Sequence, residues 1–175
     1  EQPSVLFSCD KSKLPEMYQT DNDYATILRF AIRSALIDAV KIEGSLDEDD
    51  IDDIAGQAVD LGSVPIIVIR ADQGAKADEL VQKMESRWDL EAKTFELAVP
   101  VQTKEDIQAL EDAAKAFHEA HHDATVIPHP IGKIAKEAML QGQTFGAPLL
   151  YTTDGEETET LPTSTAIHKL LHPEE

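Results

Sequence analysis

V-P-I-I-V-I, residues 64–69, is the stretch of sequence that decides the fold. It is apolar at every position and lacks the alternation of polar and apolar residues that a strand with one face in water shows. A continuous apolar run of this length is typical of a central strand in a parallel sheet, which is covered on both faces. Apolar residues at helical spacing lie before and after it, so the sequence predicts an α/β fold with a mainly parallel sheet.

Strand and helix patterns alternate along the rest of the chain. Strands are predicted over residues 4–9, 64–69, 93–101, 125–128 and 149–152. Helices are predicted over residues 22–42, 75–88, 104–122, 132–141 and 164–171, with a further helix after Ser45. We expect the first helix to turn Tyr24, Leu28 and Ala35 inward. The alternation predicts a single α/β domain, residues 1–175, built as a Rossmann-like three-layer sandwich with helices on both faces of the sheet.

Acidic residues dominate the charge of the chain. Its 34 Asp and Glu against 15 Lys and Arg give a formal net charge of -19, which repels phosphate backbones and anionic membrane surfaces. The sequence holds no apolar stretch near the roughly 20 residues that a membrane-spanning helix needs. We therefore expect no direct nucleic-acid binding and no membrane partner. The single cysteine, Cys9, excludes an internal disulfide and favours a reducing, cytoplasmic location.

A run of acidic residues, 47–50, follows Ser45. Ser45 and Glu48 have the spacing of a capping box, in which the two side chains bond to backbone N–H groups at the start of a helix. Carboxylates in a first helical turn also face the positive end of the helix dipole. We interpret the run as a helix N-terminus, with an acidic metal-binding cluster as the alternative.

One stretch matches a known metal motif: H-E-A-H-H, residues 118–122. In the pattern H-E-x-x-H, two imidazoles one helical turn apart bind zinc, and the Glu acts as general base. Here these roles would fall to His118, His122 and Glu119. A third zinc ligand would have to come from elsewhere, and His129 does not have the spacing that the longer form of the motif requires. The sequence argues against bound zinc, and a zinc-dependent hydrolase is kept as an alternative.

I-P-H-P-I-G-K, residues 127–133, leaves a predicted strand and enters a predicted helix. Its two prolines stiffen the turn, and Gly132 and Lys133 stand at the helix start. A helix N-terminus with a lysine beside it suits an anion, because its N–H groups point outward and its dipole is positive there. An ordinary strand-to-helix turn stiffened by proline is the alternative.

The second half of the chain resembles the ParA/MinD family of partition ATPases. The resemblance is carried by a long helix over residues 104–122, by T-V-I-P at 125–128, by E-A-M-L-Q-G-Q-T-F at 137–145 and by P-T-S-T-A at 162–166. It implies a fold related to the P-loop NTPases, with ATP and Mg²⁺ as cofactors. Asp10 and Asp72 would then lie near Mg²⁺, and Pro128, His129 and Pro130 near the base. The resemblance further implies self-association and a protein partner.

The glycine-rich phosphate loop of that family does not occur in residues 1–175. The chain would therefore be a fragment whose phosphate loop precedes Glu1, or a relative that does not hydrolyse nucleotide. Whether it is an enzyme is left open. Three hypotheses follow: a domain related to the ParA-type partition and positioning ATPases, a non-enzymatic acidic module for protein interaction on a Rossmann-like scaffold, and the zinc-dependent hydrolase.

Overall fold

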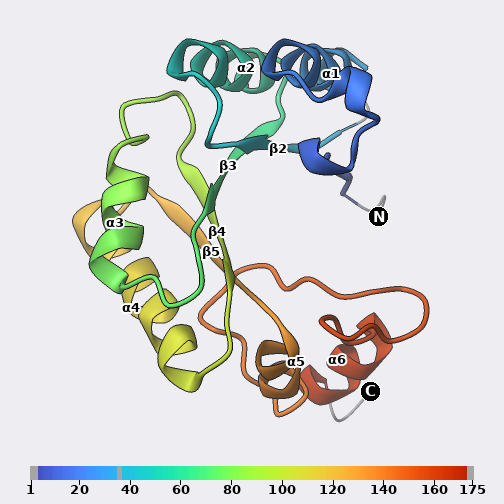
Figure 1. Cartoon of the computed structure of the whole chain (residues 1–175), viewed down its shortest axis with the longest axis vertical. Helices are drawn as coiled ribbons and strands as arrows, with labels where there is room; N and C mark the ends of the chain where they lie inside the picture. Colours follow the sequence, from blue (N-terminus) through green and yellow to red (C-terminus); the bar gives the residue numbers. More distant parts are fainter. Residues whose placement is uncertain (1–3, 35–36, 173–175) are drawn as a thin grey trace. The chain divides into compact units, whose positions relative to one another are not determined.

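The computed structural model describes residues 4–34 and 37–172, in which strands and helices alternate (Figure 1). The strands are β1 (Leu6–Phe7), β2 (Ala39–Glu43), β3 (Val64–Arg70), β4 (Thr94–Pro100) and β5 (Thr125–Ile131). The helices are α1 (Asp21–Arg33), α2 (Glu48–Asp60), α3 (Ala77–Glu85), α4 (Lys104–Ala120), α5 (Lys133–Met139) and α6 (Ser164–Leu171), with short 3-10 turns η1 (Lys11–Lys13) and η2 (Glu16–Tyr18). The predicted α/β fold with a mainly parallel sheet is confirmed.

The strands stand in the sheet in their order along the chain, β1-β2-β3-β4-β5. β1, β2 and β3 pair in parallel, and α1 and α2 are the crossovers between them. Sequential alternation of one strand and one helix is also the order of β/α barrels, whose active sites lie at the carboxyl ends of the strands. In the part of the chain that the structure describes, no helix combines the length and apolarity needed to cross a membrane.

Contacts within the chain divide it into two compact units. Unit 1 comprises Glu1–Ile69 and Met84–Phe95, and unit 2 comprises Arg70–Lys83 and Glu96–Glu175. Each has its own buried side chains, such as Tyr24 and Ile42 in unit 1 and Leu110 and Phe117 in unit 2. That residues 1–175 form a single domain stays a prediction.

Unit 1 is organised around β2, against which α1 and α2 both pack. Val40 and Ile42 of β2, Leu28 of α1 and Ile54 of α2 are all fully buried. α1 begins after Thr20, whose side chain accepts a hydrogen bond from the backbone N–H of the third helical residue, at 3.1 Å. Burial of one apolar stripe from each helix against the strand accounts for the amphipathic pattern of both helices.

The predicted helix over residues 22–42 is wrong in its second part, because α1 ends at Arg33 and the chain then enters β2. A-V-K-I-E alternates with a period of two: its valine and isoleucine face one side of the sheet, and Lys41 and Glu43 face the other. Lys41 and Glu43 are nevertheless only 9% and 8% exposed. The strand is therefore buried on both faces although its sequence is not continuously apolar. The helical spacing upstream concealed the change. Ala35, expected on the inner face of the helix, lies outside the described residues.

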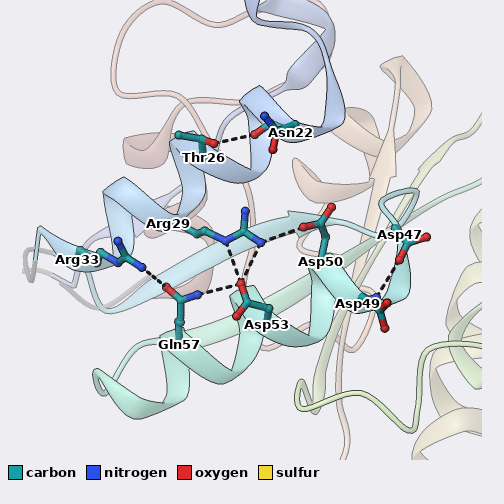
Figure 2. Close-up of polar contacts among 9 residues, drawn as sticks. All are labelled: Asn22, Thr26, Arg29, Arg33, Asp47, Asp49, Asp50, Asp53 and Gln57. Atoms are coloured by element: carbon teal, nitrogen blue, oxygen red, sulfur yellow. Dashed lines mark hydrogen bonds and ion pairs between the residues drawn. The ribbon is translucent and has the colours of Figure 1, made fainter.

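A polar network joins α1 to α2 in unit 1 (Figure 2). Arg29 donates from Nε to Asp53 and from Nη2 to Asp50, each at 2.9 Å. Gln57 donates to the Asp53 carboxylate at 2.9 Å and accepts from Arg33 at 3.2 Å. The hydrogen bond from Arg29, helped by that from Gln57, lowers the pKa of Asp53 below its ordinary value. We call these five residues the α1–α2 network.

The acidic run at residues 47–50 stands at the start of α2, as the sequence predicts. Asp47 is the N-cap and accepts from the backbone N–H of Asp49 at 3.1 Å, and the next three carboxylates occupy the first turn. The cap is therefore Asp47 rather than Ser45, two residues later than expected. Asp50 has a second role, because it belongs to the α1–α2 network.

In unit 2, α4 packs against β5 and buries Leu110, Ala113 and Phe117. A second apolar cluster gathers around α5 and α6 and consists of Val101, Ile107, Ala135, Met139, Phe145 and Ile167. Gly132 connects β5 to α5 at a φ of 142°, and a Cβ at this position would lie 2.7 Å from the carbonyl oxygen of Val101. Glycine is therefore required where the chain turns from β5 into α5.

Residues 149–152, predicted as a last strand, do not form one. They lie in the loop between α5 and α6, where an isolated bridge pairs Thr153 with Thr163. The apolar letters that suggested a strand have another cause: Leu150 packs against the apolar cluster around α5 and α6. The next residue, Tyr151, contacts one residue of β4 through its hydroxyl and one residue of β5 through its ring, as described below.

Candidate active site

β4 carries one charged side chain in an apolar strand, Glu96 in T-F-E-L-A-V-P. Side chains alternate between the two faces of a strand, so Phe95 and Leu97 point to one face and Glu96 to the other. The Glu96 side chain is only 2% exposed. A buried carboxylate is costly unless hydrogen bonds replace those it made to water, so Glu96 marks a place where donors converge.

His129 of β5 is the first partner. Its Nδ1 lies 2.8 Å from Oε1 of Glu96, and its side chain is 20% exposed. With Glu96 charged, the Nδ1–H group donates to the carboxylate, which leaves Nε2 as the nitrogen that can accept a proton. Glu96 therefore orients the imidazole and can stabilise its protonated form.

Tyr151 is the second partner and comes from the loop between α5 and α6. Its hydroxyl donates to Oε2 of Glu96, and its ring lies against that of His129 with centroids 4.1 Å apart. Burial, the hydrogen bond to Glu96 and the nearby negative charge raise the pKa of Tyr151 far above its ordinary value. Tyr151 is thus a neutral donor at all physiological pH values. Glu96, His129 and Tyr151 together are called the Glu96 cluster.

The Glu96 cluster has the parts of a general acid–base centre. A carboxylate fixes one nitrogen of an imidazole, and the other nitrogen is left to exchange protons with a bound molecule. The low exposure of Glu96 strengthens its interaction with an imidazolium, because little water screens the pair. Such an arrangement can move a proton to or from a carbon or oxygen atom of a substrate.

A pocket of about 620 Å³ opens in unit 2 at the carboxyl ends of the strands. It is lined by the end of β3 and the loop after it, by one turn of α3, and by Ala98, Pro100 and Ile131. Because side chains repeat every second residue, these three share the strand faces of Glu96 and His129. The face that carries the Glu96 cluster therefore continues into the pocket, at the end of the strands where β/α folds bind ligands.

The predicted cofactor-binding residues fall in three places in the structure. His129 belongs to the Glu96 cluster, and Asp72 lines the 620 Å³ pocket. Pro128 and Pro130 flank His129 in β5 and are buried. Asp10 lies in unit 1, where it caps η1 by accepting from the backbone N–H of the second residue after it, at 3.0 Å. That these residues bind a cofactor stays a prediction.

The turn that enters α5 was expected to suit an anion. Lys133 there is exposed and lies 3.9 Å from Glu137, one turn further along the helix. Anion binding at this turn stays a prediction.

The H-E-x-x-H segment lacks the geometry of a zinc site. α4 ends at Ala120, so His122 lies beyond the helix that would have placed it one turn from His118. The two rings are 6.2 Å apart between centroids, and Nδ1 of His118 is bonded to the carbonyl oxygen of Ala124 at 3.0 Å. Glu119 lies 3.9 Å from Lys115 on the exposed side of the helix. Within residues 4–34 and 37–172, no group of three potential metal-binding side chains comes together.

Sequence reasoning missed Glu96 and Tyr151. A signal for Glu96 was present, since a single acid in the middle of an otherwise apolar strand is expensive to bury and needs a compensating partner. Tyr151 had no comparable signal, because it lies on a loop 55 residues away from Glu96. Only the folded chain brings its hydroxyl to the carboxylate.

Comparison with known proteins gives a family. The family model for type I 3-dehydroquinase matches residues 2–174. The 3-dehydroquinate dehydratases of Salmonella paratyphi B and Salmonella agona are each 28% identical over 134 residues, which is 75% of this chain and 53% of theirs. The chain thus spans about half the length of the curated relatives it matches.

Solved structures agree in fold. Type I 3-dehydroquinate dehydratase from Clostridium difficile, with covalently modified comenic acid, has a TM-score of 0.76 at 19% identity and matches 88% of this chain and 61% of its own. The 3-dehydroquinate dehydratase from Enterococcus faecalis has a TM-score of 0.75 at 17% identity, with 98% and 69% matched. At these sequence identities the structural similarity shows a shared fold.

The hypothesis of a ParA/MinD-type partition ATPase is wrong, and so are the acidic interaction module and the zinc-dependent hydrolase. The stretches that suggested it, T-V-I-P and the helix after it, belong to β5 and α5 of the observed fold. The expectation of ATP and Mg²⁺ rested on that family alone. Matched over residues 2–174, the chain belongs to the type I 3-dehydroquinase family.

Proposed function

We propose that this chain uses the Glu96 cluster to eliminate water from a hydroxy ketone of the 3-dehydroquinate class. The observation that carries the proposal is the 2.8 Å contact between Nδ1 of His129 and a carboxylate that is 2% exposed. The family and the names of the curated relatives support the reaction class. The chain spans about half the length of those relatives, so the proposal for its activity is argued from its own residues.

The chemistry needs one proton to move twice. A ketone acidifies the hydrogen on the carbon next to it, and a base must take this proton while a hydroxyl on the following carbon departs. His129 accepts the proton at Nε2 and, as imidazolium, gives it to the departing hydroxyl. The C–H and C–O bonds break, a C=C bond forms, water leaves and His129 returns to its neutral form. Glu96 stabilises the intermediate imidazolium, and Tyr151 holds Glu96.

His129→Ala tests the role of the imidazole in the full chain. A positioned acid–base group contributes typically about 10²- to 10⁴-fold, so loss of the imidazole should lower kcat by that factor. The absorbance of the unsaturated ketone formed from 3-dehydroquinate measures turnover. Exchange of the hydrogen next to the ketone for deuterium, followed by NMR, measures proton removal by itself.

His122→Ala is the matched control, because it removes an exposed imidazole outside the cluster. It should leave both readouts unchanged. Equal rates in His129→Ala and the unsubstituted chain would sink the proposal. So would an unsubstituted chain that neither forms the unsaturated ketone nor exchanges hydrogen.

We also propose a cytoplasmic location, supported by the single cysteine of the sequence. Self-association or a protein partner is proposed as well. Its support is the exposure of large apolar side chains in unit 1, with Phe30 and Met17 78% and 74% exposed. Sedimentation velocity over a range of chain concentrations tests self-association.

A further inference from the structure

A second pocket of unit 2, about 450 Å³ in volume, lies at the amino end of β5. One face of α4, the start of β5 and the loop after α5 line it. Its volume is in the range of small-molecule sites. In a parallel sheet the amino ends of the strands lie at the edge opposite their carboxyl ends, so this pocket is separate from the 620 Å³ pocket. Its lining residues also differ from those of the Glu96 cluster.

One acidic and two basic side chains stand along the α4 wall of this pocket. Glu111, Lys115 and His118 are spaced by four and three residues, which places them on one face of the helix. Lys115 is 76% exposed and lies 3.9 Å from Glu119, and Glu111 accepts from Gln143 at 3.4 Å. Both contacts are long, and exposed ion pairs contribute little energy, so a bound ligand can replace either partner.

The buried part of the pocket wall is apolar. Val126 and Phe145 belong to it and are 8% and 3% exposed. In residues 4–34 and 37–172, Phe145 is the one residue other than glycine with a positive φ, at 58°. With Gly146 it forms the centre of a turn that a 2.9 Å hydrogen bond from Ala147 to Thr144 closes. A bulky residue keeps this conformation only where its surroundings hold it, so the position of Phe145 in the wall is fixed.

We propose that this pocket binds a free α-amino acid with an apolar side chain. Such a molecule carries an ammonium, a carboxylate and an apolar group on one carbon atom, and the wall offers a counterpart for each. Glu111 accepts from the ammonium, Lys115 donates to the carboxylate, and the apolar side chain lies against Phe145. A plain anion would be repelled by Glu111 and a plain cation by Lys115, so the zwitterion suits the wall better than either. Binding here needs no turnover at the Glu96 cluster.

Titration of the full chain with L-phenylalanine, followed by NMR, tests the proposal. Two further probes each lack one charge: phenylpropanoate has no ammonium, and phenylethylamine has no carboxylate. L-Phenylalanine should move the amide signals of Ala114, Ala124 and Gly146 in a saturable way, with a Kd of roughly 1 mM or tighter. The other two probes should bind about three- to tenfold more weakly, because each leaves one charge of the wall without a partner.

Two variants separate the two charges of the wall. Lys115→Gln should weaken binding of L-phenylalanine about three- to tenfold and leave that of phenylethylamine unchanged, since this probe has no carboxylate. Glu111→Gln should weaken L-phenylalanine by a similar factor and should not weaken phenylpropanoate. Lys133→Gln is the matched control, because Lys133 is 77% exposed and also lies 3.9 Å from a glutamate one turn further along its helix, outside the pocket. It should bind L-phenylalanine as the unsubstituted chain does.

Three results would each overturn the inference. The first is the absence of saturable movement of these amide signals at roughly 10 mM L-phenylalanine. The second is equal affinity of the unsubstituted chain for the three probes. The third is a loss of affinity in Lys115→Gln no larger than in Lys133→Gln. Movement confined to the amides of the 620 Å³ pocket places the amino acid elsewhere and contradicts the inference as well.

Discussion

The α1–α2 network and the Glu96 cluster use the same chemistry, carboxylates held by hydrogen-bond donors, at opposite degrees of exposure. Asp50 and Asp53 in the network are 36% and 52% exposed, whereas Glu96 is 2% exposed. Water and salt compete with Arg29 for the first pair and have little access to Glu96. The same bond length of about 2.8–2.9 Å therefore corresponds to different energetics in the two places.

This difference in exposure indicates different roles for the α1–α2 network and the Glu96 cluster. Exposed ion pairs contribute about 0–1 kcal/mol, and the network is of the kind that fastens two neighbouring helices weakly. A buried carboxylate loses hydration worth several kcal/mol and regains it only through well-placed donors, so an apolar side chain would often stabilise the strand equally well. The Glu96 cluster is therefore better explained by chemistry than by stability.

Matched truncations, Glu96→Ala and Asp53→Ala, test the comparison with the largest expected difference. Glu96→Ala leaves the His129 and Tyr151 donors without their acceptor and should lower the free energy of unfolding by about 3–5 kcal/mol. Asp53→Ala should lower it by about 1 kcal/mol or less. Urea denaturation followed by circular dichroism measures both. Equal losses in the two variants would show that burial does not separate the two assemblies.

Tyr151→Phe gives a smaller effect and a dependence on pH. The variant removes one donor to Glu96 and should cost about 1–3 kcal/mol at neutral pH. Because the folded chain raises the pKa of Tyr151, the phenol ionises first in the unfolded chain. The stability due to Tyr151 is thus complete below its ordinary pKa of 10.0 and is lost as the pH rises above it.

Unfolding free energies at pH 8, 9, 10 and 11, values chosen to bracket that pKa, measure this loss. The gap between the unsubstituted chain and Tyr151→Phe should narrow by up to about 1.4 kcal/mol per pH unit above pH 10. Tyr18→Phe is the control, since Tyr18 is 48% exposed. A gap that stays constant up to pH 11 would contradict the burial of an un-ionised Tyr151.

The regular elements could be predicted where the pattern of apolar residues had one period over enough residues. β3, α4 and α6 lie at or within two residues of their predicted bounds. β2 was missed because it is only five residues long, so its alternation of apolar and charged residues was too short to be separated from the helical spacing before it. Its assignment depends on pairing with β1 and β3, which local sequence does not contain.

The candidate site could be predicted only in part. His129 was named as a site residue only because the resemblance to the partition ATPases implied that residues 128–130 lie near a nucleotide base. Its partners depend on contacts 33 and 22 residues away along the chain, to Glu96 and to Tyr151. The loop that carries Tyr151 has no periodic pattern, and Leu150 beside it packs against the apolar cluster around α5 and α6.

Arg29→Gln gives the smallest expected effect and tests the exposed side of the comparison. It removes the donor shared by Asp50 and Asp53, at a cost of about 1 kcal/mol or less at low salt. The cost should fall toward zero in 1 M salt, where the screening length is about 3 Å. The effect of Glu96→Ala should change little with salt, because the carboxylate is shielded from ions by burial. Urea denaturation of both variants at low and high salt measures this. A cost of Arg29→Gln that persists in 1 M salt would show that the α1–α2 network acts by packing of the arginine stem rather than by charge.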